Sequence, residues 1–338
     1  MLVEETFTPG TRGRPSMMLE LGPATDVFIG IEISEQGGRI LGVDGSGALI
    51  GRPLTFSGGS RVEEIERLVA HFLVSCPNRE VGAIVVGVPG VVSRDGQRVQ
   101  TSARLPHLEE ITSSDLDSAF GTGPCVFAND ANCMALAEYH HGVNTGLMKE
   151  GETLLCIYAS RGLGAGIVDG GRIIPGASGS AGEISHVRLS KIWDEECTCG
   201  GRGCLETIVS GGALIKQVRA AGFPVESVDD ILEFSRRGHL APGKLMEERA
   251  RTFGTAVAML ANFLNPANVV LTGDTFRLEG YAEDVIRYTF EASHPITAQG
   301  LTIRTSCESM PCVAYGAALV ARSRVLPLEL SRPLPQRV

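Results

Sequence analysis

Positive charge is scarce in this sequence. Its 338 residues contain 30 Lys and Arg against 39 Asp and Glu, which gives a formal net charge of -9 and a pI near 5.4. A protein that wraps nucleic acid usually presents a broad basic face to it. We therefore expect that this polypeptide by itself does not hold nucleic acid through such a face.

Long apolar runs are also missing, and so is a start that resembles a signal peptide. No run reaches the roughly 20 residues that a helix needs to span a bilayer. We find no internal repeat, no low-complexity tract and no sign of disorder, and we expect a cytoplasmic protein with no membrane partner. In that reducing compartment the cysteines outside any metal site are expected to be free thiols. They are Cys76, Cys125, Cys133, Cys156, Cys307 and Cys312.

The length and composition indicate an α/β protein of two domains. A chain of 338 residues is longer than one hydrophobic core usually supports. Its 43% apolar residues, 20% charged residues and 42 glycines suit strands and helices joined by many tight turns. Because ligands often bind where two domains meet, an interdomain cleft is the expected binding site.

The most informative stretch is Cys197-Thr-Cys-Gly-Gly-Arg-Gly-Cys-Leu-Glu206, a knuckle with three cysteines within eight residues. The glycines between them let the backbone curl until the three sulfurs face one point. His186 is the nearest upstream candidate for a fourth ligand, which would complete a closed Cys3His zinc site. A closed site leaves no position for substrate, so we expect a structural Zn2+. The alternative is a set of ordinary buried thiols, which is disfavoured because core packing does not require this spacing on a polar loop.

The pattern C-x-C-G-x-x-G-C-x-E, preceded by G-E-x-x-H at 182–186, resembles the signature of the ROK family of sugar-responsive repressors and sugar kinases. The resemblance implies an α/β, actin-like (ribonuclease H-like) sugar kinase fold of two domains, with a zinc knuckle over 186–206. We accordingly expect a linker or tail over 1–25 and a first domain over 26–128, completed by a C-terminal helix at 315–330. The second domain is expected over 129–314.

Local patterns agree with that fold. The first half predicts a meander of three strands at 27–33, 39–43 and 48–50. An amphipathic helix at 62–74 and a buried parallel strand at 81–86 follow. Strands, then a crossover helix, then a parallel strand form one half of an actin-like fold. The second half predicts strands at 153–158 and 268–273, a hairpin at 167–174, and helices at 207–221, 245–264 and 316–324.

Both phosphate loops of the ROK kinases are altered here. The kinases carry D-x-G-G-T after their first strand, whereas the matching stretch is Glu32-Ile-Ser-Glu-Gln36. Glu35 adds negative charge where ATP brings its own, and the glycines that admit a phosphate are missing. In the second loop Ser160-Arg161 replaces a small hydroxyl residue. This loop keeps its glycines, which are weak evidence for phosphate because hairpins use glycine too: Gly162, Gly164 and Gly166.

The stretch Phe127-Ala-Asn-Asp-Ala-Asn132 joins the end of a strand to a helix that is expected to begin at Asn132. The resemblance implies that Asp130 matches the general base on the sugar hydroxyl in the kinases, and that Asn129 is a sugar ligand. A structural alternative exists, because Asp and Asn are favoured at helix N-caps and the Asp130 carboxylate would then serve the first turn. The knuckle downstream favours the sugar site.

A sugar presents hydroxyl groups that both donate and accept hydrogen bonds, so its site needs carboxylates and amides at fixed geometry. The candidate set is Asn129, Asp130, Glu183, His186 and Glu206. A metal in the knuckle would hold the last three rigidly, and His186 would serve zinc and sugar through its two ring nitrogens. Arg104 stands where the family commonly has Asn, which leaves the choice of sugar open.

The first 24 residues contain the basic segment Thr11-Arg-Gly-Arg-Pro15 and a strand-like stretch at 18–21. In ROK repressors a winged helix-turn-helix is followed by a similar Gly-Arg-Pro linker. We therefore favour a DNA-binding head that is absent from this chain over a plain frayed N-terminus.

Three functions remain open. The first is the sugar-sensing body of a ROK-type transcriptional regulator, a homodimer or homotetramer that binds a sugar or sugar phosphate and reaches DNA only through a winged helix absent from this chain. The second is an ATP-dependent hexose kinase, glucokinase-like, that uses Mg-ATP with Asp130 as base. The third is a non-catalytic sugar-binding protein. Asp130 favours the kinase, whereas Glu32-Ile-Ser-Glu-Gln36 and the linker favour the regulator, which we expect.

Overall fold

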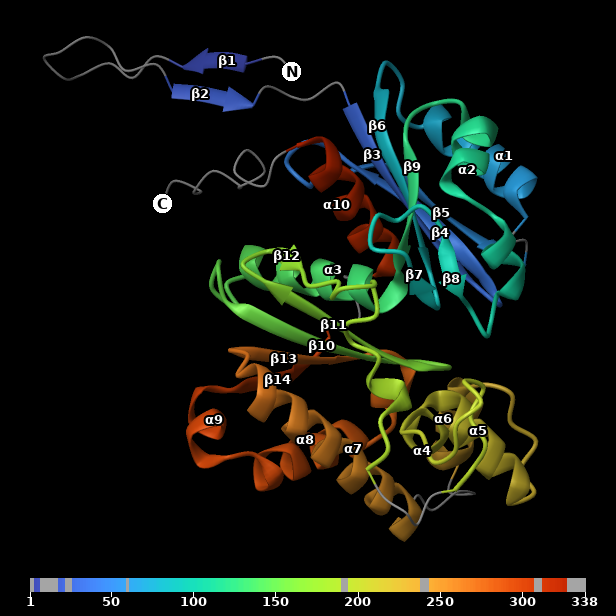
Figure 1. Ribbon diagram of the computed structural model, residues 1–338, viewed down its shortest axis with the longest axis vertical. Coiled ribbons are helices and arrows are strands. Elements are labelled where there is room, and N and C mark those ends of the chain that lie inside the picture. The colour runs from blue at the N-terminus through green and yellow to red at the C-terminus, as the bar shows by residue number, and fades with distance from the viewer. Residues whose placement is uncertain are drawn as a thin grey trace, which may run out of the picture. The chain divides into compact units, whose positions relative to one another are not determined.

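The computed structural model describes residues 3–6, 18–21, 26–58, 61–189, 194–237, 243–306 and 312–326. The chain divides into two compact units, one of Met1–Cys133 with Cys312–Val338 and one of Met134–Pro311 (Figure 1). The predicted linker over 1–25 lies outside the described residues, except for two paired strands, β1 (Val3–Thr6) and β2 (Met18–Leu21). Cys307 and the end of the predicted C-terminal helix, 327–330, also lie outside them.

The first unit is built on a five-stranded sheet in the order β5-β4-β3-β6-β9. Its meander consists of β3 (Asp26–Ser34), β4 (Gly37–Val43) and β5 (Leu49–Ser57), all antiparallel. β6 (Glu80–Val88) lies parallel to β3, and β9 (Cys125–Asn129) parallel to β6. The predicted meander and parallel strand are confirmed. β5 runs to Ser57 rather than 50, because its largely exposed residues lack the apolar run that marks β3 and β6.

Helices cover both faces of this sheet (Figure 1). The predicted helix at 62–74 is α1 (Val62–Val74), which buries its apolar stripe on one face together with α2 (Ser113–Phe120). α10 (Val313–Val325) packs on the other face and approaches β3 closely at Gly30, where a Cβ would overlap the carbonyl oxygen of Ala314. β7 (Val91–Val92), β8 (Val99–Thr101) and the 3-10 helix η1 (Pro106–Glu110) precede α2.

The second unit repeats the same sheet plan, in the order β12-β11-β10-β13-β14. The antiparallel strands are β10 (Thr153–Ala159), β11 (Leu163–Asp169) and β12 (Arg172–Ile173). β13 (Asn268–Thr272) and β14 (Thr302–Thr305) follow in parallel. The predicted strands at 153–158 and 268–273 and the hairpin at 167–174 are confirmed, and the hairpin turns at Gly170 and Gly171, both with positive φ.

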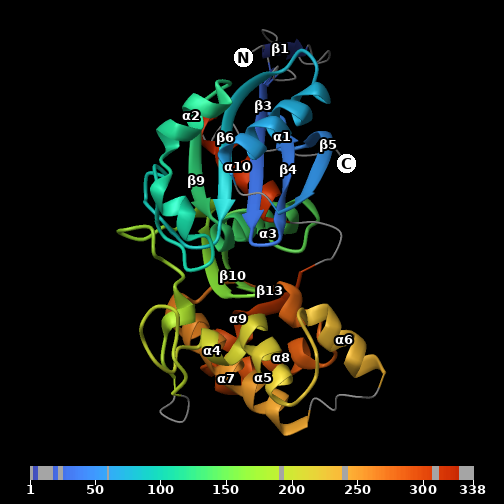
Figure 2. The ribbon, with the colours of Figure 1, turned by 90° about the vertical axis from the view of Figure 1, so that its right-hand side faces the viewer.

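Most helices of the second unit gather on one face of its sheet (Figure 2). They are α4 (Glu206–Val209), α5 (Gly211–Ala220), α6 (Val228–Arg236), α7 (Gly243–Leu264), α8 (Tyr281–Ala292) and α9 (Pro295–Gly300). α3 (Asp130–Asn144) runs from the first unit into the second and places the fully buried Glu138 against Arg304 of β14, 2.9 Å away. Among the described helices, none combines the length and the apolar character needed to cross a membrane.

Three sequence expectations need correction. The helix predicted at 207–221 is two helices, because Ser210 is extended and its hydroxyl caps α5 by accepting the N–H of Ala213 at 3.1 Å. The glycine-rich turn predicted at 161–166 is shorter, since Gly164 and Gly166 pair with β10 inside β11 and only Gly162 lies in the turn. The helix expected to begin at Asn132 begins at Asp130.

Candidate functional site

The cysteines of the knuckle and His186 converge on one point in the second unit. The sulfurs of Cys197, Cys199 and Cys204 and a ring nitrogen of His186 all lie within 4.8 Å of one another. The Cys199 and Cys204 sulfurs are 3.7 Å apart, and the Cys197 sulfur is 3.7 Å from His186 Nδ1. A tetrahedral zinc with bonds of about 2.3 Å to sulfur holds its ligand atoms about 3.7 Å apart. The donor set therefore fits a closed zinc site.

The backbone of the knuckle supports the thiolate form of one ligand. The N–H of Gly201 donates to the Cys199 sulfur at 3.4 Å, and this bond lowers the pKa of Cys199. Burial acts in the opposite direction on Cys204 and, with the neighbouring thiols, raises its pKa to about 12. Thiolates are the metal ligands, so a bound cation would supply the charge that keeps Cys204 deprotonated.

His186 stands between the sulfurs and a carboxylate. Its Nδ1 faces Cys197, and its Nε2 lies 3.7 Å from Glu183 Oε2. Glu206 Oε2 is 3.9 Å from the Cys197 sulfur, so both predicted carboxylates lie beside the knuckle. An imidazole that ligates a metal commonly directs its second nitrogen to such a carboxylate, which orients the ring.

Glu183 lies in a partly buried environment beside two other ionisable groups. Burial raises the pKa of its carboxyl, His186 opposes the shift, and the negative charge of Glu206 adds to it. As a carboxylate, Glu183 would accept hydrogen bonds from sugar hydroxyl groups. The second unit thus brings together Glu183, His186 and Glu206, three of the five predicted sugar ligands.

Gly182 determines how Glu183 enters this group. Its φ is 92°, and a Cβ there would overlap the carbonyl oxygen of Ala165 in β11. The chain therefore crosses β11 in direct backbone contact before the short 3-10 helix η2 (Ile184–His186) begins. Glycine is required at this position for both conformation and space.

The other two predicted sugar residues lie in the first unit, where β9 ends and α3 begins. The structure assigns the capping role to Asn129. Its Oδ1 accepts the N–H of Asn132 at 2.9 Å, and its Nδ2 donates to the Gly90 carbonyl at 2.9 Å. Asp130 accepts from the N–H of Ala131 at 2.8 Å and from the Asn129 amide at 3.2 Å. The structural alternative weighed from the sequence thus applies to Asn129, with Asp130 already inside the helix.

The altered first phosphate loop is a tight hairpin. β3 passes into β4 through the two exposed residues Glu35 and Gln36, and the hydroxyl of Ser34 donates to the Gly37 carbonyl at 2.9 Å. The glycines that follow do not open toward a ligand, because a Cβ at Gly37 would overlap the Phe56 carbonyl and one at Gly38 would overlap that of Glu32. Their backbone is already used within the sheet.

The second altered loop is also closed by the chain itself. The N–H groups of Gly211 and Gly212, at the start of α5, donate to the carbonyls of Ser160 and Arg161 at 2.8 and 2.9 Å. The Ser160 hydroxyl donates to a carboxylate oxygen of Asp274 at 2.9 Å. A helix N-terminus that is free can bind phosphate through such N–H groups. Here the N–H groups of Gly211 and Gly212 are already bonded to the second phosphate loop.

Sequence reasoning missed two residues beside these loops. Arg39 faces Glu32 across the β3–β4 pair; burial opposes its charge, but Cys312 and Glu32 together raise its pKa. Asp274 opens the 3-10 helix η3 (Asp274–Arg277) after β13, 114 residues from its partner Ser160. The position of the turn before Gly37 sets the register of this hairpin, so it could have predicted that Arg39 faces Glu32. Arg104, which stands where the family commonly has Asn, is half-buried between β8 and η1.

Comparison with known proteins gives this site its context. The ROK family model matches residues 59–322. Over 220 residues, 61% of this chain and 52% of the relative, the sequence is 30% identical to the DNA-binding transcriptional dual regulator NagC of Escherichia coli K12. The chain thus spans about half the length of that relative.

Two solved structures share the fold. A ROK hexokinase from Thermus thermophilus is 26% identical to this chain and superposes with a TM-score of 0.71. The match covers 88% of this chain and 99% of the hexokinase chain. A ROK family transcriptional regulator, homologous to the E. coli MLC protein, is 24% identical with a TM-score of 0.76, covering 98% and 87%. The family model spans well over half of the sequence, so the chain belongs to the ROK family.

Proposed function

We propose that this chain is the sugar-binding and oligomerising body of a ROK-type transcriptional regulator, built as a homodimer or homotetramer. The effector is a sugar or sugar phosphate held through Glu183, His186 and Glu206, with a structural zinc in the adjacent knuckle. Asn129 and Asp130 complete the predicted ligand set.

One observation carries the choice of regulator over kinase: the β3–β4 hairpin that replaces the first phosphate loop. A phosphate cradle needs backbone N–H groups that point at the ligand and no competing negative charge. The Gly37 and Gly38 backbone packs on neighbouring strands instead, and the turn ahead of it holds Glu35. The second loop adds support, because Ser160 and Arg161 already accept the N–H groups at the start of α5.

The charge of the chain supports a regulator in which one part binds the sugar and a separate part binds DNA. The net charge of -9 argues against DNA binding by the body itself. DNA binding would belong to a winged helix linked through the Gly-Arg-Pro segment, and the body would transmit the state of the sugar site to it. The regulator NagC, which this chain resembles over half its length, carries DNA binding in its name.

Ligand binding is the direct experiment. Thermal melts and calorimetry are run with hexoses, pentoses, N-acetylhexosamines and their phosphates, and separately with Mg-ATP. We expect at least one sugar to stabilise the protein, by about 2.7 kcal/mol at a hundredfold excess over its dissociation constant. Mg-ATP is expected to give no signal. No response to any sugar would overturn the proposal.

A hexose kinase is the second candidate, favoured by Asp130 at the position of the family's general base. Its requirements are a micromolar Mg-ATP affinity and a sugar-dependent release of ADP that the Asp130→Asn variant abolishes. Observing both would replace the regulator by the kinase. An in-frame winged helix encoded upstream of Met1 would instead separate the regulator from a plain sugar-binding protein.

A further inference from the structure

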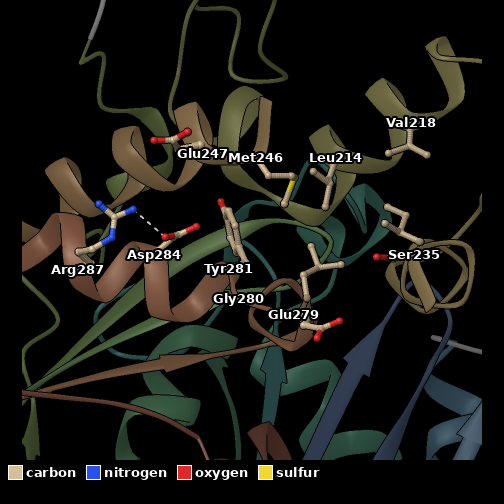
Figure 3. A pocket seen from close by; sticks show the side chains of 12 residues that line it. Leu214, Val218, Ser235, Met246, Glu247, Glu279, Gly280, Tyr281, Asp284 and Arg287 are labelled. Atoms are coloured by element: carbon tan, nitrogen blue, oxygen red, sulfur yellow. Dashed lines mark hydrogen bonds and ion pairs between the residues drawn. The ribbon is translucent and has the colours of Figure 1, made fainter. Parts of the chain in front are cut away.

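A cavity of about 480 Å³ lies in the second unit, among helices that carry none of the predicted metal or sugar ligands (Figure 3). Its walls come from α5, α6, α7 and the segment where η3 passes into α8. The volume falls within the roughly 300–1,000 Å³ typical of sites for small organic ligands. The cavity is thus large enough to hold one.

The inner wall is apolar. Leu214, Val218, Ile231 and Leu278 are buried side chains that line it, and the partly buried Met246 adds a flexible thioether. Tyr281 stands in the same wall, and Figure 3 shows its ring near Met246 and Leu214. Such a lining favours an aromatic or branched aliphatic group over a sugar.

The polar groups of the rim carry a negative excess. Three carboxylates, Glu247, Glu279 and Asp284, line the cavity against one guanidinium, Arg287. Arg287 is already committed, with Asp284 at 2.8 Å, Glu291 at 3.2 Å and the Tyr288 ring 4.0 Å below its guanidinium carbon. Its charge is therefore not available to an incoming anion.

The carboxylates differ in what already holds them. Glu247 accepts the Tyr288 hydroxyl at 2.8 Å and lies 3.5 Å from Arg251, while Asp284 is paired with Arg287. Glu279 makes no hydrogen bond or ion pair with any residue in the described parts of the chain. It is the one rim carboxylate there whose charge is left to meet a ligand.

We propose that this cavity is a binding site for a small amphipathic amine, with its apolar body against Leu214, Val218 and Ile231 and its ammonium group at Glu279. This site is separate from the sugar site, and its existence does not depend on the regulator assignment.

A buried charge behind the wall bears on the orientation of the amine. Arg249 of α7 is almost fully buried, its nitrogens have no hydrogen-bond partner among the described residues, and desolvation lowers its pKa to about 10. The charges of Tyr281 and Glu195 act against this shift. Because this positive charge lies toward Tyr281, the ammonium group is placed at Glu279 and the neutral body at Tyr281.

Three matched probes test the charge preference. 2-Phenylethylamine is a cation at neutral pH, 2-phenylethanol is neutral, and 3-phenylpropanoate is an anion, while the apolar body is the same. We expect the amine to bind about fivefold more tightly than the alcohol, the size of a partly exposed ion pair. Screening by 1 M salt should remove most of that difference. Calorimetry and ligand-observed NMR measure the affinities.

Variants locate the site. Glu279→Gln, on an exposed side chain, is expected to reduce the amine to the affinity of the alcohol without changing the melting temperature. The matched control is Glu283→Gln, an exposed carboxylate in the first turn of α8 that does not line the cavity. Val218→Phe, which fills the cavity, should weaken both amine and alcohol.

The contrary results are specific. Equal affinities of amine and alcohol would refute the role of Glu279, and tighter binding of the carboxylate would assign the cavity to anions attracted by Arg249. Failure of all three probes to bind the wild-type chain at millimolar concentration would refute the site itself.

Discussion

The two units of this protein share a sheet plan but hold their candidate ligands by different means. In the first unit Asn129 and Asp130 occupy a strand-to-helix junction, where the Asn129 side chain caps α3 and bonds to Gly90. In the second unit Glu183 and Glu206 lie beside a loop of cysteines with little regular structure. Ordinary hydrogen bonds position the first pair, and a metal is expected to position the second.

The difference comes from a long segment of the second unit that adds a candidate metal site to the shared sheet plan. The stretch between β12 and β13 carries the knuckle and α4 to α7, whereas the first unit has no comparable cysteine cluster among its described residues. The four predictions below test how each unit holds its candidate ligands. They run from the largest expected effect to the smallest.

The largest effect is expected from Cys199→Ser. A four-ligand zinc site in small domains binds with about 10–16 kcal/mol, so loss of one exposed ligand should remove several kcal/mol and release the metal. We expect elemental analysis to fall from about one zinc per chain to none, and the sugar response to disappear. Cys76→Ser, a thiol of the first unit, is the control and should keep both. A variant at Cys199 that retains zinc and sugar binding would contradict the metal assignment.

Gly182→Ala should come next. The added methyl group has no space against the Ala165 carbonyl, and φ of 92° is strained for any side chain. We expect the free energy of unfolding to fall by more than about 4 kcal/mol, measured by urea denaturation. Gly200→Ala shares a positive φ of 82° but meets nothing within 4 Å, and should cost only about 1–2 kcal/mol. Similar losses in both variants would mean that the contact with β11 is unimportant.

Glu206→Gln tests the chemistry of the site with little change in shape. A hydrogen bond to a charged group contributes about 1.5–3 kcal/mol, so the sugar affinity should fall about 10- to 100-fold. Calorimetry with the best sugar of the panel gives the value. Glu196→Gln is the control in the same loop, since Glu196 is paired with Arg202 at 2.7 Å and largely exposed. An unchanged affinity at Glu206 would remove it from the site.

The smallest effect is expected from Asn129→Ala. Losing the cap of α3 should cost about 1 kcal/mol of stability, whereas Asn129→Ser keeps an acceptor oxygen and should cost less. Denaturation curves with and without a zinc chelator complete the comparison. The difference between the two variants should not change when the chelator is added. A chelator-dependent difference would show that metal also supports the first unit.

Local patterns were enough to predict a large part of this structure. The strands β3, β4 and β6, the helix α1 and the end of α7 before Pro266 all follow from apolar periodicity and helix-stopping residues. The break between α4 and α5 was missed because Ser210 interrupts a continuous apolar spacing only through its cap. α6 and α8 were missed as well, although Ser227 and Asp230 form a capping box at the start of α6.

The knuckle could be read from the sequence by itself because its sulfurs are only a few residues apart, and short loops bring such neighbours together whatever the rest of the chain does. Its spacing also identified His186 and the two glutamates beside it. The tertiary structure alone decided how the altered phosphate loops are filled and where a cavity forms. Ser160 meets Asp274 across 114 residues, and the cavity needs four separate helices, so packing of distant segments, which no local pattern records, determines both.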